Sequence, residues 1–128
     1  MERINLNSGS PWENKVGYSR AVKINNVIEV SGTTAVKDGR VIGKGDAYIQ
    51  TKYILGKISE ILEELGSEIK DVVRTRMYVI DISLWSEIGK AHAEFFHTIK
   101  PAATMVEVKS LIDPDMLVEI EVMAITVS

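Results

Sequence analysis

The stretches that decide the fold of this chain are residues 101–108, PAATMVEV, and residues 117–122, LVEIEV. Both alternate in polarity with a period of two, which is typical of strands whose two faces meet different surroundings. The glutamates, Glu107 in the first strand and Glu119 and Glu121 in the second, would then lie on one face of a common sheet. The sequence therefore predicts two strands with a shared apolar face and a shared acidic face.

A third predicted strand, residues 72–80, brings basic side chains to the same sheet. Arg74, Arg76 and Tyr78 alternate there with Val73 and other apolar or small residues. Charges at a buried or partly buried face need partners, and neighbouring strands place side chains within pairing distance. We expect these arginines to pair with the glutamates across the sheet.

The remaining elements follow from turn residues and from the period of the apolar positions. Asn25-Asn26 and Asp38-Gly39 mark two hairpins, and residues 9–13 are expected to form a loop. Apolar residues at helical spacing predict two helices, the first ended by Gly66 and the second started by Ser83 or Asp81. The expected ranges are strands at 4–6, 21–24, 27–31, 35–36 and 41–42, and helices at 46–65 and 83–97.

This order of elements predicts an α+β fold with both helices on one face of a mixed sheet. A chain of 128 residues, 45% hydrophobic and 26% charged, has the size of one domain, so we assign residues 1–128 to a single domain. The opposite sheet face, which carries Arg, Glu, Tyr and Met together, is either an ordinary charged surface or a surface covered by sister subunits.

Composition excludes several functions. The chain has no cysteine, which rules out disulfides, thiol nucleophiles and zinc–thiolate sites. Its 15 basic and 18 acidic residues give a net charge of −3, without the basic excess that nucleic-acid binding requires. Neither a signal peptide nor a membrane-spanning stretch is apparent. We expect a cytoplasmic protein that binds neither nucleic acid nor membranes.

Several short motifs occur in an order that resembles the Rid family, also called YjgF/YER057c/UK114. They are GYSRAV at 17–22, VSG at 30–32, DVVRT at 71–75, PA at 101–102, VEV at 106–108 and EIE at 119–121. The resemblance covers nearly the whole chain and implies a chorismate-mutase-like fold, a homotrimer and a small-molecule cleft at each subunit interface. Its best-known members are deaminases, hydrolases that act on reactive enamines and imines such as 2-aminoacrylate.

One position departs from the imine-hydrolysing members. The residue that follows Pro-Ala in them is an arginine that holds the substrate carboxylate, and here it is Ala103. An alanine cannot replace the bidentate, charge-assisted hydrogen bonds of a guanidinium. We therefore expect simple 2-imino acids to be poor substrates. The strand bearing Ala103 and Met105 would line a pocket for another ligand, which could still be a carboxylate.

By the same resemblance, Tyr18, Ser31, Gly32 and Glu119 match the family's pocket positions. Glu119 would orient an attacking water, since a carboxylate withdrawn from solvent exchanges a proton near neutral pH. The alternative is that Glu119 is a structural partner of Arg74 or Arg76.

Two further residues are candidates for ligand binding. Arg20 would leave the same strand face as Tyr18 and could replace the missing cation, or it could be a solvent-facing edge residue. Arg76 is a second candidate cation, although pairing with glutamates competes for it. Trp12 either packs against a neighbouring subunit or stacks on an unsaturated ligand.

The sequence indicates no metal and no cofactor. His92 and His97 are the only histidines, and their spacing places them on different sides of a helix. The resulting hypothesis is a Rid-like trimer that deaminates an enamine or imine other than a simple 2-imino acid. The alternative is a trimer that binds a ligand without catalysis. A ribonuclease activity, reported within the family, is opposed by the acidic net charge.

Overall fold

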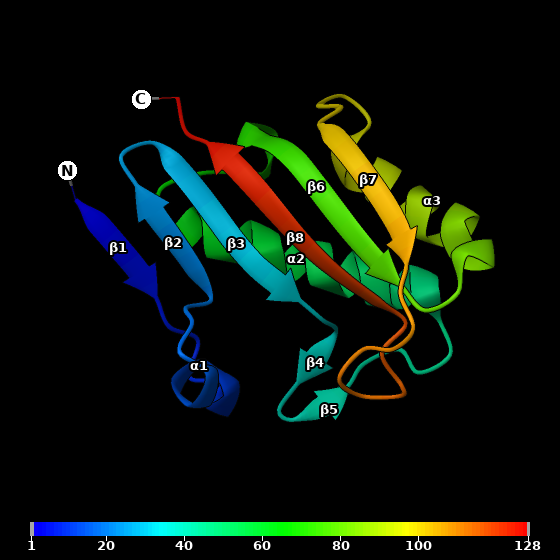
Figure 1. The fold of residues 1–128 in the computed structure, drawn as a ribbon. Coiled ribbons are helices and arrows are strands. Elements are labelled where there is room, and N and C mark those ends of the chain that lie inside the picture. The colour runs from blue at the N-terminus through cyan, green and yellow to red at the C-terminus, as the bar shows by residue number, and fades with distance from the viewer. Residues whose placement is uncertain (1, 128) are drawn as a thin grey trace.

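A six-stranded mixed sheet forms the centre of the computed structural model, which describes residues 2–127. Across the sheet the strands are β1 (Arg3–Leu6), β2 (Ala21–Ile24), β3 (Val27–Thr33), β8 (Val118–Ile125), β6 (Val72–Val79) and β7 (Ala102–Glu107). Neighbouring strands are antiparallel except for β6 and β7, which are parallel (Figure 1). The α+β class and the mixed sheet are confirmed.

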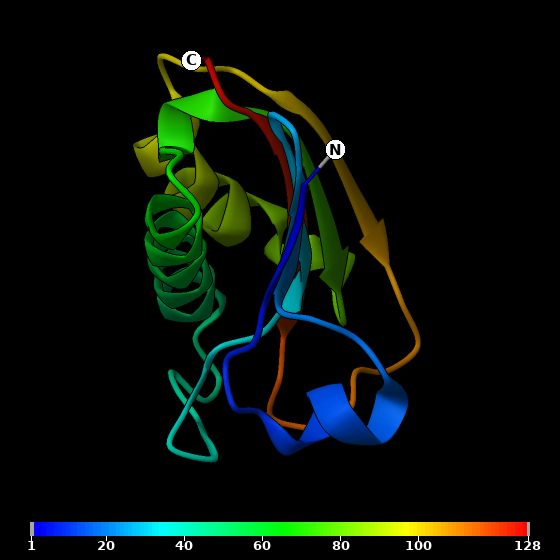
Figure 2. The same ribbon diagram turned by 90° about the vertical axis from the view of Figure 1, so that its left-hand side faces the viewer.

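The two long helices, α2 (Ala47–Glu64) and α3 (Trp85–Phe96), cover one face of this sheet (Figure 2). The core lies between them and the sheet, where Ile58 and Leu62 of α2 and Ile120 of β8 are fully buried. Over the described residues, no helix covers the opposite face of the central strands, which we call the open face. No helix in this part of the chain is long and apolar enough to cross a membrane.

Helix α2 and the two hairpins form where the sequence predicts them. The Asp46 side chain accepts a hydrogen bond from the Ile49 backbone N–H at 3.0 Å, which caps the first turn. At the other end Gly66 follows the C-cap residue with φ +78°, a conformation that glycine adopts without strain. Positive φ angles at Asn25 and Asp38 close the β2–β3 hairpin and the short β4 (Val36–Lys37) and β5 (Arg40–Val41) hairpin.

The predicted loop at 9–13 is wrong, because a short helix, α1 (Pro11–Val16), begins within it. Pro11 occupies the first turn, where its missing N–H costs nothing. Glu13 also lies in the first turn, and Gly17 ends the helix with φ 90°. Figure 2 shows α1 beyond one end of the sheet, on the side of the open face.

The face assignment of β7 is also wrong. Met105 lies beside Met77 and Glu107 beside Val79, so both are on the face that carries the helices, opposite to Glu119. Strand β7 is an edge strand exposed over most of its length, so its alternation in polarity does not record which face is buried.

Strand β6 and helix α3 differ from expectation at their first residues. The ladder between β6 and β8 shifts register between Val72 and Arg74. Val73 is therefore exposed, and does not share the buried face of Thr75 and Val79. Helix α3 follows a 3-10 turn, η2 (Ile82–Leu84), and Asp81 caps that turn by accepting the Ser83 N–H at 2.9 Å. The helix therefore begins two residues after Ser83.

A buried glutamine fixes the loop that leads into β8. The Gln50 side chain is fully buried, and its Oε1 accepts the Leu117 N–H at 2.8 Å. Its Nε2 donates to the carbonyl oxygens of Asp115 at 2.9 Å and Gly43 at 3.2 Å. Because a buried amide is expensive to leave without partners, these bonds hold the start of β8 in place.

Candidate functional site

Glu119, the second residue of β8, points onto the open face, directly beside Gly32 of β3. A Cβ atom added to Gly32 would overlap the carboxylate oxygen Oε2 of Glu119 and lie 3.0 Å from its Cδ. Gly32 occupies this point because β3 changes register against β8 between Val30 and Thr33. The absence of a side chain at residue 32 is therefore what makes room for the carboxylate.

The pKa of Glu119 is raised above its ordinary value of 4.5, first because burial removes water from the carboxylate. The positive charge of Arg20 opposes this shift, and the negative charge of Glu121 adds to it. Burial and the like charge outweigh the arginine. The group is therefore protonated over a wider pH range than an exposed glutamate.

Neither arginine of β6 pairs with Glu119. Arg76 Nη1 lies 3.8 Å from Oε1 of Glu121. The same oxygen accepts a hydrogen bond from the Tyr78 hydroxyl at 2.8 Å. Arg74 instead donates to Thr104 Oγ1 at 2.7 Å. Among residues 2–127 the Glu119 carboxylate forms no hydrogen bond or ion pair, so the geometry does not support a role as the partner of these arginines.

Arg20 joins Tyr18 to Gly32. Its Nη2 donates to the Gly32 carbonyl oxygen at 2.6 Å, and its guanidinium carbon lies 5.8 Å from the centroid of the Tyr18 ring. The residue is only 9% exposed, and its Nε is buried without a hydrogen-bond partner. Arg20 is not solvent-facing. It lies in a bend before β2, so the conformation of this bend, and not a shared strand face, brings it to Tyr18.

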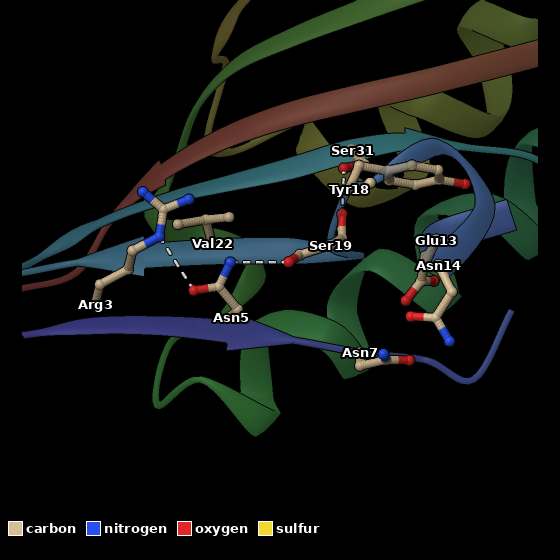
Figure 3. A pocket seen from close by; sticks show the side chains of 10 residues that line it. Arg3, Asn5, Asn7, Glu13, Asn14, Tyr18, Ser19, Val22 and Ser31 are labelled. Carbon is tan, nitrogen blue, oxygen red and sulfur yellow. Dashed lines mark hydrogen bonds between the residues drawn. The ribbon is translucent and has the colours of Figure 1, made fainter.

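Tyr18 and Ser31 line a pocket of about 520 Å³ on the open face. Ser31 Oγ donates to the Ser19 carbonyl oxygen at 2.6 Å, and Tyr18 is 37% exposed. The rest of the lining is mostly polar and includes Arg3, Asn5, Asn7, Glu13 and Asn14 (Figure 3). Arg20, Gly32 and Glu119 do not line this pocket, although Arg20 lies against the Tyr18 ring and Gly32 directly follows Ser31.

Glu13 positions Tyr18, a contribution that the sequence did not reveal. Its carboxylate accepts hydrogen bonds from the backbone N–H and the hydroxyl of Ser8, and its side chain is 2% exposed. Its backbone oxygen accepts the N–H groups of Gly17 at 2.9 Å and Tyr18 at 3.0 Å. The available signal was Ser-Pro-x-Glu at residues 10–13, a pattern found at the first turn of helices.

Arg3, Asn5 and Asn7 were also missed as pocket residues. Arg3 and Asn5 alternate with Ile4 and Leu6 along β1, so the period of two places both on one face, and Asn7 directly follows the strand. That polar alternation was the signal that could have identified them.

Ala103 and Met105 lie away from these residues within one chain, and Trp12 does not line the pocket. Ala103 and Met105 are on β7, at the edge of the sheet, and β8 and β6 separate that strand from β3. Trp12 is on α1, 48% exposed, with the Lys15 amine 5.9 Å from its ring centroid. A cleft that contains both Ser31 and Ala103 therefore needs a second copy of the chain.

The histidines occupy separate environments. His92 Nε2 lies 3.0 Å from Thr75 Oγ1, and burial lowers the pKa of this histidine. His97 is exposed at the end of α3. Among residues 2–127, no three His, Cys, Asp or Glu side chains lie close enough to hold a metal ion.

The fold and the site define a class: small α+β proteins that carry part of a polar site on an open sheet face. A family model described as Endoribonuclease L-PSP matches residues 10–126. A crystal structure of a YjgF/YER057c/UK114 family member from Mycobacterium tuberculosis has a TM-score of 0.89 and 46% identity, covering 98% of this chain and all of that one. The chain belongs to this family, the Rid family.

Two curated relatives are similar to the chain over most of its length. An uncharacterized protein of Streptomyces coelicolor is 40% identical over 119 residues, 93% of this chain and 89% of the relative. The 3-aminoacrylate deaminase RutC of Acinetobacter baylyi is 35% identical over 104 residues, 80% of this chain and 82% of the relative.

Gly32→Ala should change the titration of Glu119 without unfolding the protein. The new Cβ forces the carboxylate aside, and a flexible side-chain end can move at small cost. We expect a changed pKa for Glu119 in a carboxyl-carbon NMR titration, with a melting temperature close to that of the wild type. Gly56→Ala, on α2 where a Cβ meets no atom within 4 Å, is the control. An unchanged Glu119 titration in Gly32→Ala would contradict the described contact.

Proposed function

We propose that this protein acts as a cytoplasmic homotrimer with a small-molecule cleft at each subunit interface. One wall of the cleft would consist of Tyr18, Ser31, Gly32 and Glu119, and the other would be strand β7 of the neighbouring copy, with Ala103 and Met105. The sheet order supports the proposal, because β8 and β6 separate β3 from β7 and one chain cannot bring the two walls together. Trp12, exposed on α1, would contact the neighbouring subunit or the ligand.

Each cleft, in this proposal, hydrolyses an enamine or imine and releases ammonia. The observation that carries it is the Glu119 carboxylate, which is partly buried beside Gly32, has a raised pKa and forms no ion pair within the described residues. A carboxylate in such surroundings can accept a proton from water and return it to a leaving group near neutral pH. A glutamate held in an ion pair would be less able to do so.

The chemical steps are those of C=N hydrolysis. Glu119 takes a proton from a water molecule as the water oxygen bonds to the imine carbon. Glu119 returns this proton to the nitrogen, which gives a carbinolamine. It then transfers the hydroxyl proton of the carbinolamine to the same nitrogen, which leaves as ammonia while the carbonyl forms. Tyr18, held by Arg20 and by the Glu13 backbone oxygen, would hydrogen-bond the ligand from one side, with the Ser31–Gly32 backbone on the other.

The name of one relative agrees with this chemistry. RutC of Acinetobacter baylyi, 35% identical, is a 3-aminoacrylate deaminase, and 3-aminoacrylate is an enamine. Ribonuclease activity, which the family model's description suggests, is less compatible with a net charge of −3.

A second candidate function is ligand binding without catalysis. Ala103 favours it, because this wall offers no cation to hold the carboxylate of a 2-imino acid. Ammonia release decides between the two functions. Ammonia release by the wild type that is lost in Glu119→Gln supports the deaminase, and ligand binding by the wild type without any ammonia release supports the binder.

The homotrimer is tested by light scattering. We expect three times the mass of the 14.2 kDa chain at micromolar concentration, because an open face that mixes apolar and charged side chains suits a symmetric interface. A monomer mass would contradict both the trimer and the intersubunit cleft.

Glu119→Gln should abolish ammonia release from any imine that the wild type hydrolyses. Removal of a general base typically costs about 100-fold to 10,000-fold in rate. In the wild type, the rate should fall on acidification at a pH above the ordinary glutamate value of 4.5, because the raised pKa protonates the base there. Ammonia-release assays of both proteins across this pH range provide the measurement.

Glu119→Gln, which should lower the activity, should raise the stability of the protein. A carboxyl whose pKa is higher in the folded state favours folding at low pH and loses this contribution as pH rises through the folded pKa. Glu119→Gln should therefore melt roughly 2 °C higher than the wild type at pH 7.5, with no difference at pH 4. A variant less stable than the wild type at pH 7.5 would show that Glu119 has a stabilising partner.

Hydrolysis of 2-iminobutyrate by the wild type should be slow, and Ala103→Arg should increase it. A charged hydrogen bond to a carboxylate contributes about 1.5 to 3 kcal/mol, or roughly 10-fold to 100-fold in rate. Residue 103 is exposed, so an arginine fits the strand. Ala103→Gln, with length but no charge, is the control. Wild-type rates equal to those of an arginine-containing relative would contradict the role assigned to Ala103.

A further inference from the structure

The pocket beside Tyr18 and Ser31 extends along β1 to an arginine that the proposed chemistry does not use. Arg3 lines this pocket, and Figure 3 shows it at the end opposite to Glu13 and Asn14. From Arg3 to Leu6 the strand advances roughly 10 Å, and Asn7, which also lines the pocket, follows it. The pocket is therefore elongated and has a cation at its far end.

A chain of hydrogen bonds orients this arginine. Arg3 Nε donates to Asn5 Oδ1 at 3.1 Å, and Asn5 Nδ2 donates to Ser19 Oγ at 2.9 Å. The Ser19 carbonyl oxygen in turn accepts the Ser31 hydroxyl proton at 2.6 Å. Because the Asn5 amide uses its oxygen toward Arg3 and its nitrogen toward Ser19, the guanidinium is tied to the same residues that form the Tyr18 end.

The remaining donors of Arg3 are available to a ligand. Among residues 2–127, Arg3 forms no ion pair, and Nε is its only group with a hydrogen bond. The other arginines near the open face are engaged: Arg20 with Gly32, Arg74 with Thr104 and Arg76 with Glu121. Arg3 is also the one cation in the lining of this pocket over the described residues.

The opposite end of the pocket is negative. The buried Glu13 carboxylate lies there, beside Asn14 and Tyr18 (Figure 3). A pocket with a cation at one end and a carboxylate at the other favours a ligand with the reverse polarity.

We propose that Arg3 binds the terminal carboxylate of an elongated amino or imino compound whose nitrogen end lies at Tyr18 and Ser31. This inference rests on the proposed function and specifies its substrate class: the carboxylate is several carbons from the reacting nitrogen, instead of adjacent to it as in a 2-imino acid. It also accounts for the absence of a cation at residue 103, because Arg3 would bind the ligand carboxylate instead.

The test is calorimetric titration of the assembled protein at low ionic strength with two stable probes, 6-aminohexanoate and 1-aminohexane. They share the chain and the amine and differ in the terminal carboxylate. The wild type should bind 6-aminohexanoate about tenfold more tightly, the scale of one charged hydrogen bond. Arg3→Gln should remove this difference, and added salt should reduce it in the wild type.

Arg40→Gln is the matched control, because Arg40 is an exposed arginine on β5 outside the pocket. It should keep the preference, and both variants should melt close to the wild type. Equal binding of the two probes by the wild type, an unchanged preference in Arg3→Gln, or no binding of either probe would overturn the inference. Ammonia release is measured separately, so a protein that prefers 6-aminohexanoate but deaminates nothing retains the Arg3 site and loses the proposed function.

Discussion

Strand β8 is the element on which the rest of the structure depends. It is hydrogen-bonded to β3 on one side and to β6 on the other, so it joins the N-terminal strands to the C-terminal half of the sheet. Its apolar residues are buried under α2, and its two glutamates lie on the open face. Core and candidate site are thus two faces of one strand, and a one-residue slip of β8 would exchange them.

The open face has two kinds of acidic group, and their surroundings separate their roles. Glu121 is held by Tyr78 and Arg76, whereas Glu119, two residues earlier on the same strand, faces a glycine and is partly desolvated. The distinction comes from β3, where the shift in register places Gly32 against the side chain of Glu119. Two residues of the same type therefore have different partners, and burial raises the pKa of Glu119.

Much of this fold could be predicted from sequence because its signals are local. Helix α2 has a strong apolar period and a capping aspartate, and the hairpins have residues that tolerate positive φ. The faces of β7 could not be predicted, since an edge strand exposed on both sides carries no burial pattern. The short α1 was missed because six residues give too little periodicity to outweigh the loop-forming Gly9 and Ser10. For the candidate site, Tyr18, Ser31, Gly32 and Glu119 were predicted through a family resemblance. Arg3 and Asn5 were not, because only the pairing of β1 with β2 brings them beside Ser19.

The contact between Gly32 and Glu119 also restricts the order in which the sequence can change during evolution. While residue 119 is a glutamate, any side chain at residue 32 meets its carboxylate, so a substitution there displaces the group on which the proposed activity depends. If residue 119 first becomes shorter, the same substitution at residue 32 has space. The two positions are thus epistatic: one order of mutation passes through a protein with a displaced carboxylate, and the other through a protein whose site has already changed its chemistry. Drift at residue 32 should follow, and not precede, loss of the glutamate.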